Sequence, residues 1–520
     1  MGYIVGFIVA LFAVLFTSIW RLCKILVWRP YAVAKFFEKQ GIKGVPYSFL
    51  YGSLKQMKKL QAEATALVLD TNSNDIIPTV FPHYHKWSKD YGENMLYWNG
   101  VDPRITITDP EMAKQILSNK FGFYKRSRSH PSSKKLMGEK GVIFVEGEEW
   151  VRHRRILNPA FSLDKLKMMK TKIAECTISL LREWEKQALK AGKESIQIEM
   201  NGEFIKLTSD VIAHSAFGSS YVEAQEAFQA QKELQKWIVA SSTDILIPGW
   251  QYVPTPSNIR TWKLDRKLRN KLRSIVETRI SQVSKSCHYG DDLLGVMIQS
   301  SEVTGQDKVS PKFMINEIIE NCKAFFFAGH ETTANFLTWT FFILSLHQEW
   351  QQKLREEVLS ECGMEIPDSD MLSKLKLVNM VLLEVLRLYN PVIRLFRTPM
   401  EDIKLGKLII PKGTSLEISI HQVHRKKEYW GNDANNFNPM RFANGISKAA
   451  KHPNAFIPFS VGPRNCIGQT FALLEAKMVV SLFLQRFSFS LSPRYKHAPI
   501  NYITLHPRYG MPILIKPLSH

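Results

Sequence analysis

A single cysteine in a glycine-rich turn constrains this chain more than any other feature. The segment from Phe459 to Gly468 reads Phe-Ser-Val-Gly-Pro-Arg-Asn-Cys-Ile-Gly, and a long apolar helix is expected directly after it. Gly462 and Gly468 carry no Cβ, so the backbone can turn tightly and approach a flat partner. The positive N-terminal end of the helix favours a Cys466 thiolate, which could serve as an anionic ligand. Arg464 could pair with a carboxylate. The alternative is a buried structural cysteine.

A second feature is a long segment that begins at Ser310 and Pro311. Serine followed by proline is typical of a helix N-terminus, and no other proline occurs before about Gln348. The middle of this predicted helix, residues 324–329, is apolar on all sides, so we expect it to cross the core. The sequence His-Glu-Thr-Thr at 330–333 then places polar groups inside the helix, where they are costly unless paired. This suggests a task, although a satisfied threonine with a surface glutamate is the alternative.

The N-terminus predicts a membrane anchor. Tyr3 to Trp20 is an uncharged apolar run of 18 residues, which lies at the lower limit for a membrane-spanning helix. Arg21, Lys24 and Arg29 follow it, so the C-terminal side is expected to stay in the cytosol. A cleaved signal peptide is the alternative, but neither a basic start nor a clear cleavage site is present. The predicted organisation is an anchor over residues 1–22, a basic linker with a hinge over residues 23–46, and one globular domain over residues 47–520.

Composition excludes several other classes of protein. The 520 residues are 45% hydrophobic, which is ample for a large core. The six cysteines are scattered without a Cys-x-x-Cys pair, so a zinc site or a disulfide framework is not expected. The net charge is +21 without an aromatic-interleaved basic motif, which favours anionic lipid or an acidic protein partner over nucleic acid. The chain has no Walker loop and no Gly-x-Gly-x-x-Gly after a strand, so we expect it to bind neither NADPH nor flavin itself.

With Phe459 seven residues before Cys466, the glycine-rich segment resembles the haem-binding loop of the cytochrome P450 superfamily. The resemblance runs from the N-terminal anchor to the C-terminus, and the wording of the last hundred residues resembles the plant seventy-two clan, near its seven-hundred-and-nine family. Four further segments match family motifs in the expected order: Trp150–Arg154 of helix C, Ala328–Thr333 of the oxygen-activating helix I, Glu384–Arg387 of helix K, and Phe437–Phe442.

The resemblance implies a mainly α fold with small β-sheets (α+β), a single catalytic domain behind the transmembrane helix, and haem b as cofactor. Residues 407–411 and 415–418 are expected to be strands of a small sheet. Cys466 is then the axial ligand of the haem iron, while Thr332 and Glu331 manage protons at the oxygen site. The other residues implied to contact haem are Trp150, Arg154, Arg397 and Arg464 at the propionates, with Phe459, Gly462, Gly468 and Gly329 around the ring.

A structural cluster is also implied. Glu384 and Arg387 are three residues apart on one helix face, and Arg441 is expected to join them. A catalytic role for Glu384 is possible, but a buried ion-pair cluster that supports the haem loop is favoured. Two positions depart from the family pattern: Met440 stands where the family has Glu, and Asn390 stands where it has Pro. His330 is expected to be a packed core histidine, not an iron ligand.

The activity implied is insertion of one oxygen atom of O2 into a C–H bond of a lipophilic small molecule, such as a fatty acid, cytokinin, steroid or terpenoid. Electrons would come from the FMN domain of NADPH–cytochrome reductase, at the endoplasmic reticulum membrane with the catalytic domain in the cytosol. A hydroperoxide isomerase or dehydratase and a non-catalytic haem sensor are the alternatives, against which Glu331 and Thr332 argue. The substrate pocket is expected near residues 134–144, 325–328 and 392–396.

Overall fold

The computed structural model describes residues 2–119, 122–127, 131–192, 194–218, 221–241, 249–286, 289–290, 292–303 and 311–518. Helices make up most of the body and the strands are short, which confirms the predicted mainly α fold with small sheets. The helices are α1 Gly2–Cys23, α2 Arg29–Glu38, α3 Leu54–Ala64, α4 Ile77–Val80, α5 Pro82–Tyr91, α6 Pro110–Leu117, α7 Pro131–Met137, α8 Gly147–Leu157, α9 Leu163–Ala191, α10 Met200–Phe217, α11 Tyr221–Ser241, α12 Pro256–Ser286, α13 Leu293–Val303, α14 Pro311–Leu346, α15 Gln348–Cys362, α16 Ser369–Lys374, α17 Lys376–Leu388, α18 Ile420–Val423, α19 Lys427–Trp430 and α20 Gln469–Arg486.

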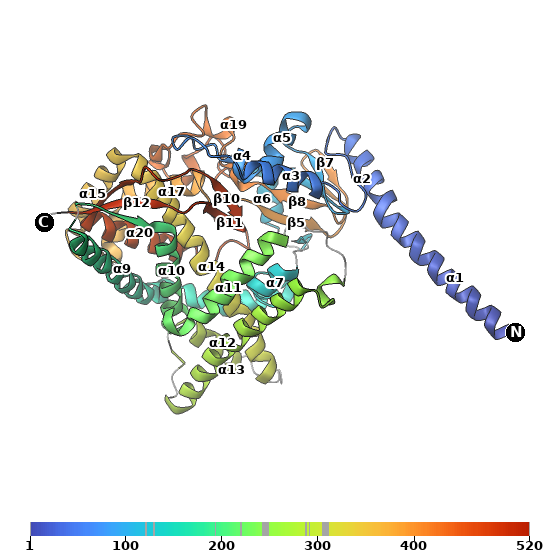
Figure 1. The fold of residues 1–520 in the computed structure, drawn as a ribbon, viewed down its shortest axis with the longest axis horizontal. Coiled ribbons are helices and arrows are strands. Elements are labelled where there is room, and N and C mark those ends of the chain that lie inside the picture. Colours follow the sequence, from blue (N-terminus) through green and yellow to red (C-terminus); the bar gives the residue numbers. More distant parts are fainter. Residues whose placement is uncertain are drawn as a thin grey trace.

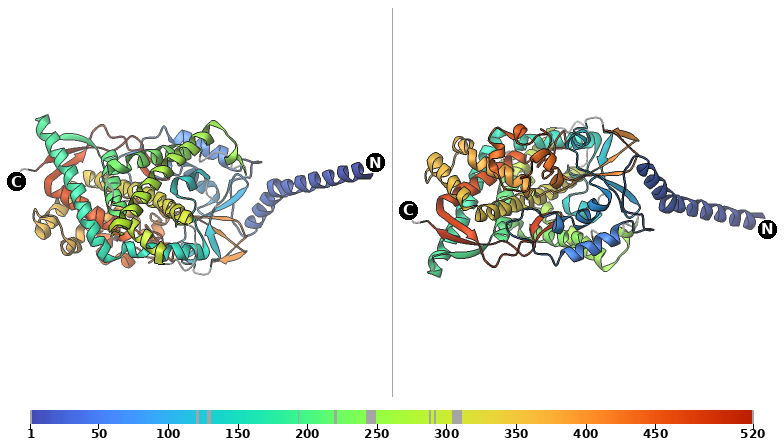
Figure 2. Two further views of the ribbon diagram at one scale, coloured as in Figure 1. Left: turned by 90° about the horizontal axis from the view of Figure 1, so that it is seen from below. Right: turned by 90° about the horizontal axis from the view of Figure 1, so that it is seen from above.

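The long helix α14 runs through the middle of the body, with other helices around it (Figure 2). Its 36 residues confirm the predicted helix that begins at Pro311. From Ile318 onward nearly every side chain is buried, because the sequence is apolar on all faces and the helix is enclosed by α10, α17 and α20. The helix therefore carries any polar group in its middle into the core.

Most of the strands form small sheets toward the two ends of the body, as expected, while the pair β10-β11 lies between them (Figure 1). The larger sheet has the order β1-β2-β8-β5-β3 and lies near α2, while the sheet β4-β12-β9 lies near the C-terminus. The predicted strands at 407–411 and 415–418 are confirmed as β7 and β8. The strands are β1 Leu96–Asn99, β2 Asp102–Ile107, β3 Tyr124–Arg126, β4 Ile196–Glu199, β5 Leu395–Pro399, β6 Ile403–Leu405, β7 Leu408–Ile410, β8 Ser415–Ile418, β9 Phe487–Leu491, β10 Pro499–Tyr502, β11 Thr504–Pro507 and β12 Pro512–Pro517.

The N-terminal helix projects from the body as a separate rod (Figures 1 and 2). Helical structure continues without a break from Gly2 to Glu38 and is long and apolar enough to cross a membrane. The side chains of α1 are all exposed. Within the predicted basic linker, a short π-helix over residues 24–28 leads into α2. Pro30 and Phe37 of α2 are buried, so this part of the linker packs against the body as a helix.

Candidate functional site

The Cys466 loop, residues 459–468, is closed by a hydrogen bond from the Cys466 backbone N–H to the Phe459 carbonyl at 2.9 Å. Gly462 has a φ of +77°, and a Cβ at this position would lie 2.5 Å from the Leu117 carbonyl oxygen. The glycine is thus required by close approach to the end of α6, and its expected contact with a flat partner stays a prediction. Gly468 differs, because the nearest atom to a Cβ at this position would belong to the ring of Phe161, at 3.9 Å.

Cys466 is exposed to solvent at the surface of its loop. The protein atoms packed around the thiol raise its pKa, whereas the backbone N–H of Gly468 and the charge of Arg154 lower it, and the net direction is upward. The role of Cys466 as an anionic ligand stays a prediction. A bound metal ion would reverse this balance, because it deprotonates a coordinating thiol outright.

Helix α8 brings Trp150 and Arg154 to the Cys466 loop. Arg154 donates to the backbone and side-chain oxygens of Asn465, both at 3.1 Å. The guanidinium of Arg464 lies over the Trp150 ring, 4.7 Å from its centroid. Four of the residues predicted from separate motifs, Trp150, Arg154, Arg464 and Cys466, therefore come together, with Arg154 bracing the loop beside the cysteine.

Three guanidinium groups gather beside this loop, and we call Arg126, Arg397 and Arg464 the arginine cluster. Arg126 on β3 and Arg397 on β5 are directly paired in the antiparallel register. Burial, followed by the charges of the other arginines, lowers the pKa of Arg126 to about 9, and burial with the charge of Arg464 lowers that of Arg397 to about 10. Arg126 was not predicted from the sequence, because only the pairing of β3 with β5 brings it here.

The arginine cluster has too few anions of its own. Among the described residues, Glu146 is the carboxylate whose charge acts on Arg126, Arg397 and Arg464, and it contacts Arg464. Three guanidinium charges against this one carboxylate leave two positive charges in excess. Nε of Arg126 and Nη1 of Arg464 are buried without a hydrogen-bond partner among the described residues. The two carboxylates of haem would supply two negative charges and the missing acceptors, so the residues present fit this cofactor.

The predicted oxygen site lies on α14, and Phe161 connects it with the Cys466 loop. The Phe161 ring stacks on Phe325 with 5.7 Å between centroids, and it is also the nearest neighbour of Gly468. The Thr332 hydroxyl donates to the carbonyl of Ala328 at 2.7 Å.

Two other expectations on α14 have different outcomes. A Cβ at Gly329 would lie 2.7 Å from the Ile212 side chain, so packing against α10 requires this glycine, and the expected approach of a flat cofactor stays a prediction. His330 is buried, its ring Nδ1 contacts the Phe326 carbonyl, and its ring packs edge-on against Phe228. The interpretation of His330 as a packed core residue is confirmed.

Glu331 is fully enclosed and carries several hydrogen bonds. One of its carboxylate oxygens lies 2.6 Å from His506 Nε2, 2.8 Å from the Thr504 hydroxyl and 2.6 Å from the Gln235 amide. Burial raises the pKa of Glu331, but the charge and hydrogen bond of His506, the charge of His330 and the Gln235 hydrogen bond outweigh it and lower the pKa to about 2. Glu331 is therefore a carboxylate at neutral pH.

The predicted Glu384 cluster of Glu384, Arg387 and Arg441 also forms. Both carboxylate oxygens of Glu384 accept from Arg387 at 2.7 Å, and Arg441 Nε lies 3.6 Å away. Met440 is exposed, and Arg441 pairs with Asp433 at 2.5 Å.

The second departure from the family pattern makes a specific contact of its own. The side-chain amide of Asn390 donates to the carbonyl of Pro458 at 3.2 Å, and its oxygen accepts from the Val392 N–H at 3.0 Å. This asparagine thus joins the end of α17 to the residue before the Cys466 loop.

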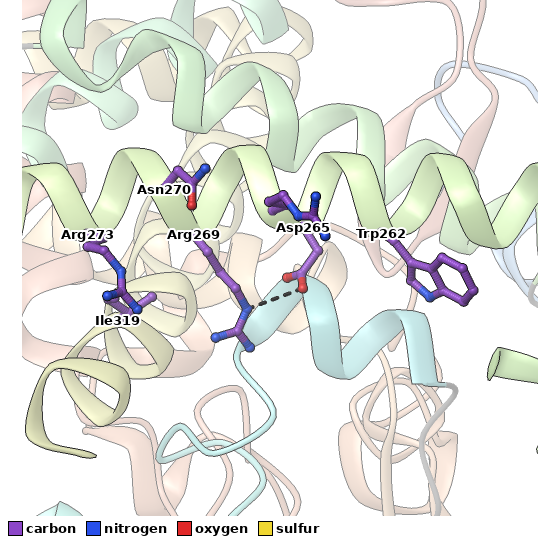
Figure 3. Close-up of a pocket in the computed structure, with 7 residues that line it drawn as sticks. Trp262, Asp265, Arg269, Asn270, Arg273 and Ile319 are labelled. Carbon is purple, nitrogen blue, oxygen red and sulfur yellow. Dashed lines mark hydrogen bonds and ion pairs between the residues drawn. The ribbon is translucent and has the colours of Figure 1, made fainter. Parts of the chain in front are cut away.

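A hollow of about 330 Å³ lies on α12, away from the residues above (Figure 3). Two of its arginines have side-chain partners: Arg269 contacts Asp265 at 3.2 Å and Glu320 at 2.5 Å, and Arg273 donates to Asn316 at 3.2 Å. Its open, polar lining is unlike the apolar site expected for a lipophilic substrate. The lining residues are Trp262, Asp265, Arg266, Arg269, Asn270, Arg273 and Ile319.

Comparison with known proteins agrees with this arrangement. The family model "Cytochrome P450" matches residues 75–511. The chain is 51% identical to cytochrome P450 709B1 and 50% identical to cytochrome P450 709B3, both of Arabidopsis thaliana, over at least 96% of each chain. It is 41% identical to secologanin synthase 2 of Catharanthus roseus over 98% of this chain and 96% of that protein. Proteins of this family hold haem through a cysteine thiolate and use it for oxygen chemistry. The chain therefore belongs to the cytochrome P450 family and is a haem-dependent monooxygenase.

Proposed function

We propose that this protein is a membrane-anchored monooxygenase in which Cys466 is the haem ligand and a lipophilic small molecule is hydroxylated. The observation that carries the proposal is the arginine cluster, whose two excess positive charges lie beside the Cys466 loop. Haem held by a thiolate supplies the activation of dioxygen. In this proposal Arg126, Arg397 and Arg464 orient the cofactor through its carboxylates, and Arg154 keeps the loop closed.

The overall reaction consumes the substrate, O2, two electrons and two protons, and it yields an alcohol and water. Thr332 and Glu331 are the groups proposed to deliver the protons, since both lie on the turn of α14 that follows Phe325–Ala328. The electrons are proposed to come from NADPH–cytochrome reductase, whose acidic face suits a chain with net charge +21. The helix Gly2–Glu38 supports anchoring at the endoplasmic reticulum membrane with the catalytic body in the cytosol.

The proposed substrate class is a fatty acid, or a hormone or terpenoid such as a cytokinin or a steroid. The apolar character of Phe325, Phe326 and Phe327 supports a lipophilic ligand. Substrate-induced spectral shifts of the purified protein would be screened against these compounds, followed by turnover with reductase and NADPH. Oxygenated product that depends on NADPH is expected. Rearrangement of a hydroperoxide without NADPH would instead support the isomerase, and ligand binding without any turnover would support the haem sensor.

Thr332→Ala tests the proposed proton delivery. Alanine is the better helix former, so folding, haem content and substrate binding should survive. The hydroxyl that helps deliver a proton at the oxygen site would be absent, so NADPH consumption should continue while hydroxylated product falls and hydrogen peroxide rises. The ratio of product to NADPH measures this, with peroxide assayed in parallel. Unchanged coupling would overturn the role given to Thr332, and loss of haem would show a structural role.

A further inference from the structure

We infer that His506 is a positioning residue for oxygen activation: it holds the Glu331 carboxylate and passes protons to it from solvent. This inference rests on the proposed function, because Glu331 is taken as a proton donor at the oxygen site. If so, the β10–β11 hairpin takes part in the proton supply. This hairpin lies over two hundred residues after α8, the helix that contacts the Cys466 loop. Nothing in the spacing of the family motifs assigns a role to this hairpin.

The geometry of the pair is that of a charge-assisted hydrogen bond. His506 Nε2 lies 2.6 Å from a carboxylate oxygen of Glu331, a separation typical of strong contacts between charged groups. Thr504 on the same strand contacts both partners, at 2.8 Å from the Glu331 oxygen and 2.9 Å from His506 Nε2. The side-chain amide of Gln235 on α11 donates to the same Glu331 oxygen at 2.6 Å. Glu331 is therefore held by two elements other than its own helix.

His506 and Glu331 differ in their exposure to solvent, which gives the proposed proton transfer a direction from His506 to Glu331. The Glu331 side chain is 3% exposed, whereas that of His506 is 12% exposed. Glu331 adjoins Thr332 in the chain, so the buried partner lies on the inner side of the pair. The other charged groups that face this site are His330, whose Nε2 is 3.9 Å from the second Glu331 oxygen, and Lys232, whose charge acts on His330.

The proposed proton step is balanced without any change of oxidation state. The Nε2–H bond of the His506 imidazolium breaks and an O–H bond forms on Glu331, which leaves a neutral imidazole and a carboxylic acid. Glu331 then gives this proton inward toward the Thr332 site and returns to the carboxylate, while His506 takes a new proton from water. A histidine suits this role because its charge changes near physiological pH.

A purely structural role for His506 is the competing explanation, since it could simply fasten the hairpin to α14. Other contacts already do so. Trp339 of α14 donates its indole N–H to the Leu505 carbonyl at 3.0 Å, and the Leu505 N–H donates to the Pro391 carbonyl at 3.0 Å. The hairpin should therefore stay docked when His506 is replaced, which makes the variant informative.

The test is His506→Gln in the full-length holoenzyme, assayed with reductase and a substrate identified by the spectral screen. Glutamine can still donate a hydrogen bond to Glu331 but cannot gain or lose a proton near neutral pH. We expect unchanged haem content and substrate binding, a several-fold lower ratio of product to NADPH, and higher hydrogen peroxide. We also expect the pH dependence of this ratio to differ between the wild type and the variant, because glutamine cannot relay a proton to Glu331.

His452→Gln is the matched control, because His452 also faces a carboxylate, Glu111 at 3.8 Å, but on the surface. The control should keep both the coupling and the pH profile of the wild type. Wild-type coupling and an unchanged pH profile in His506→Gln would overturn the inference.

A second measurement does not depend on turnover. Unfolding midpoints of the holoenzyme would be compared for His506→Gln, Glu331→Gln and the double variant. Because the two side chains act on each other, we expect the double variant to lose clearly less than the sum of the single losses. Additive losses would show that the pair does not interact and would overturn the inference. If wild-type protein forms no oxygenated product from any substrate, the proposed function fails, while this cycle still reports on the pair.

Discussion

Two groups of buried arginines in this molecule differ in how their charge is balanced. In the Glu384 cluster, Arg387 donates to both oxygens of Glu384, and its remaining N–H groups reach the carbonyls of His424, Ala434 and Asn436. In the arginine cluster, three guanidiniums share Glu146, and two of their nitrogen atoms lack a partner among the described residues. The first group carries carboxylates of its own, Glu384 for Arg387 and Asp433 for Arg441, and is structural, although Arg441 Nε is also buried without a hydrogen-bond partner among the described residues. The second requires an additional anion, and this marks it as a binding site.

The largest effect is expected from removing the carboxylate of the Glu384 cluster. Glu384→Ala leaves Arg387 and Arg441 buried without their carboxylate, which costs about 3–5 kcal/mol of unfolding free energy. Little holoprotein should accumulate, as measured by the yield of haem-containing protein and by thermal unfolding. Glu194→Ala is the control, because this carboxylate forms an ion pair with Lys516 at the surface, and it should change neither quantity. Full haem loading with loss of turnover alone would instead indicate that Glu384 is catalytic.

The second prediction concerns the ligand beside the arginine cluster. A neutral serine hydroxyl cannot replace the electron donation of a thiolate, so Cys466→Ser should lose the red-shifted carbon monoxide spectrum of the reduced enzyme. The fold should persist, which circular dichroism would show. Cys362→Ser, at a buried cysteine of α15, should keep the spectrum. A retained spectrum in Cys466→Ser would falsify the assignment of Cys466 as the ligand.

The third prediction concerns the arginine cluster itself. Arg126→Met removes one of three mutually repelling charges, so the unfolding midpoint without haem should hold or rise. The same change removes a hydrogen-bond donor to a haem carboxylate, which is worth about 1.5–3 kcal/mol for a charged group. Haem transfer to a scavenging protein should accelerate on the order of tenfold, since each 1.4 kcal/mol is a factor of about ten. A lower unfolding midpoint with unchanged haem release would instead show that Arg126 has a structural role.

The smallest effect is expected at Glu475 on α20, a second buried carboxyl that contrasts with Glu384. Both Glu475 oxygens lack a partner among the described residues, and burial raises the pKa of Glu475 well above its usual value. A raised pKa means that the folded state binds the proton more tightly, so this group costs stability as the pH rises from about 4.5 toward the folded pKa. Glu475→Gln should therefore be more stable than the wild type at pH 7–8, and this advantage should vanish at acidic pH.

Thermal unfolding across this pH range measures the effect. A wild-type advantage at neutral pH would mean that Glu475 is ionised and paired in the holoprotein. Glu475 would then resemble Glu384 in having a favourable partner.

The sequence predicted the local features of the site well. Helix α14 could be found from its periodicity, and the Cys466 loop and the Glu384–Arg387 pair could be found because each short segment resembles a family motif. Arg126 and His506 were missed for a different reason. Arg126 lies in a strand of three residues whose partner is over two hundred residues away, and His506 faces Glu331 only after the C-terminal hairpin folds back on α14.

The reasons for particular glycines were also beyond the sequence. Gly462 and Gly329 were expected to make room for a cofactor, and the structure adds that Leu117 and Ile212 occupy the space that a side chain would need. Conformational freedom can be inferred from a glycine, whereas the neighbour that demands it depends on tertiary packing. The same holds for Asn390, whose contact with Pro458 explains a departure from the family pattern that the sequence alone left open.

In the proposed anchored state, the unbroken helix from Gly2 to Glu38 would determine how the body is oriented against the membrane. A flexible tether would let the body roll freely above the lipid, whereas a stiff rod fastened by Phe37 couples the tilt of its apolar part to the tilt of the body. A span that is short for the bilayer stands more upright as the bilayer thickens. Membrane thickness would then set how closely the sheet beside α2 rests on the headgroups, and with it the depth from which a lipophilic molecule enters.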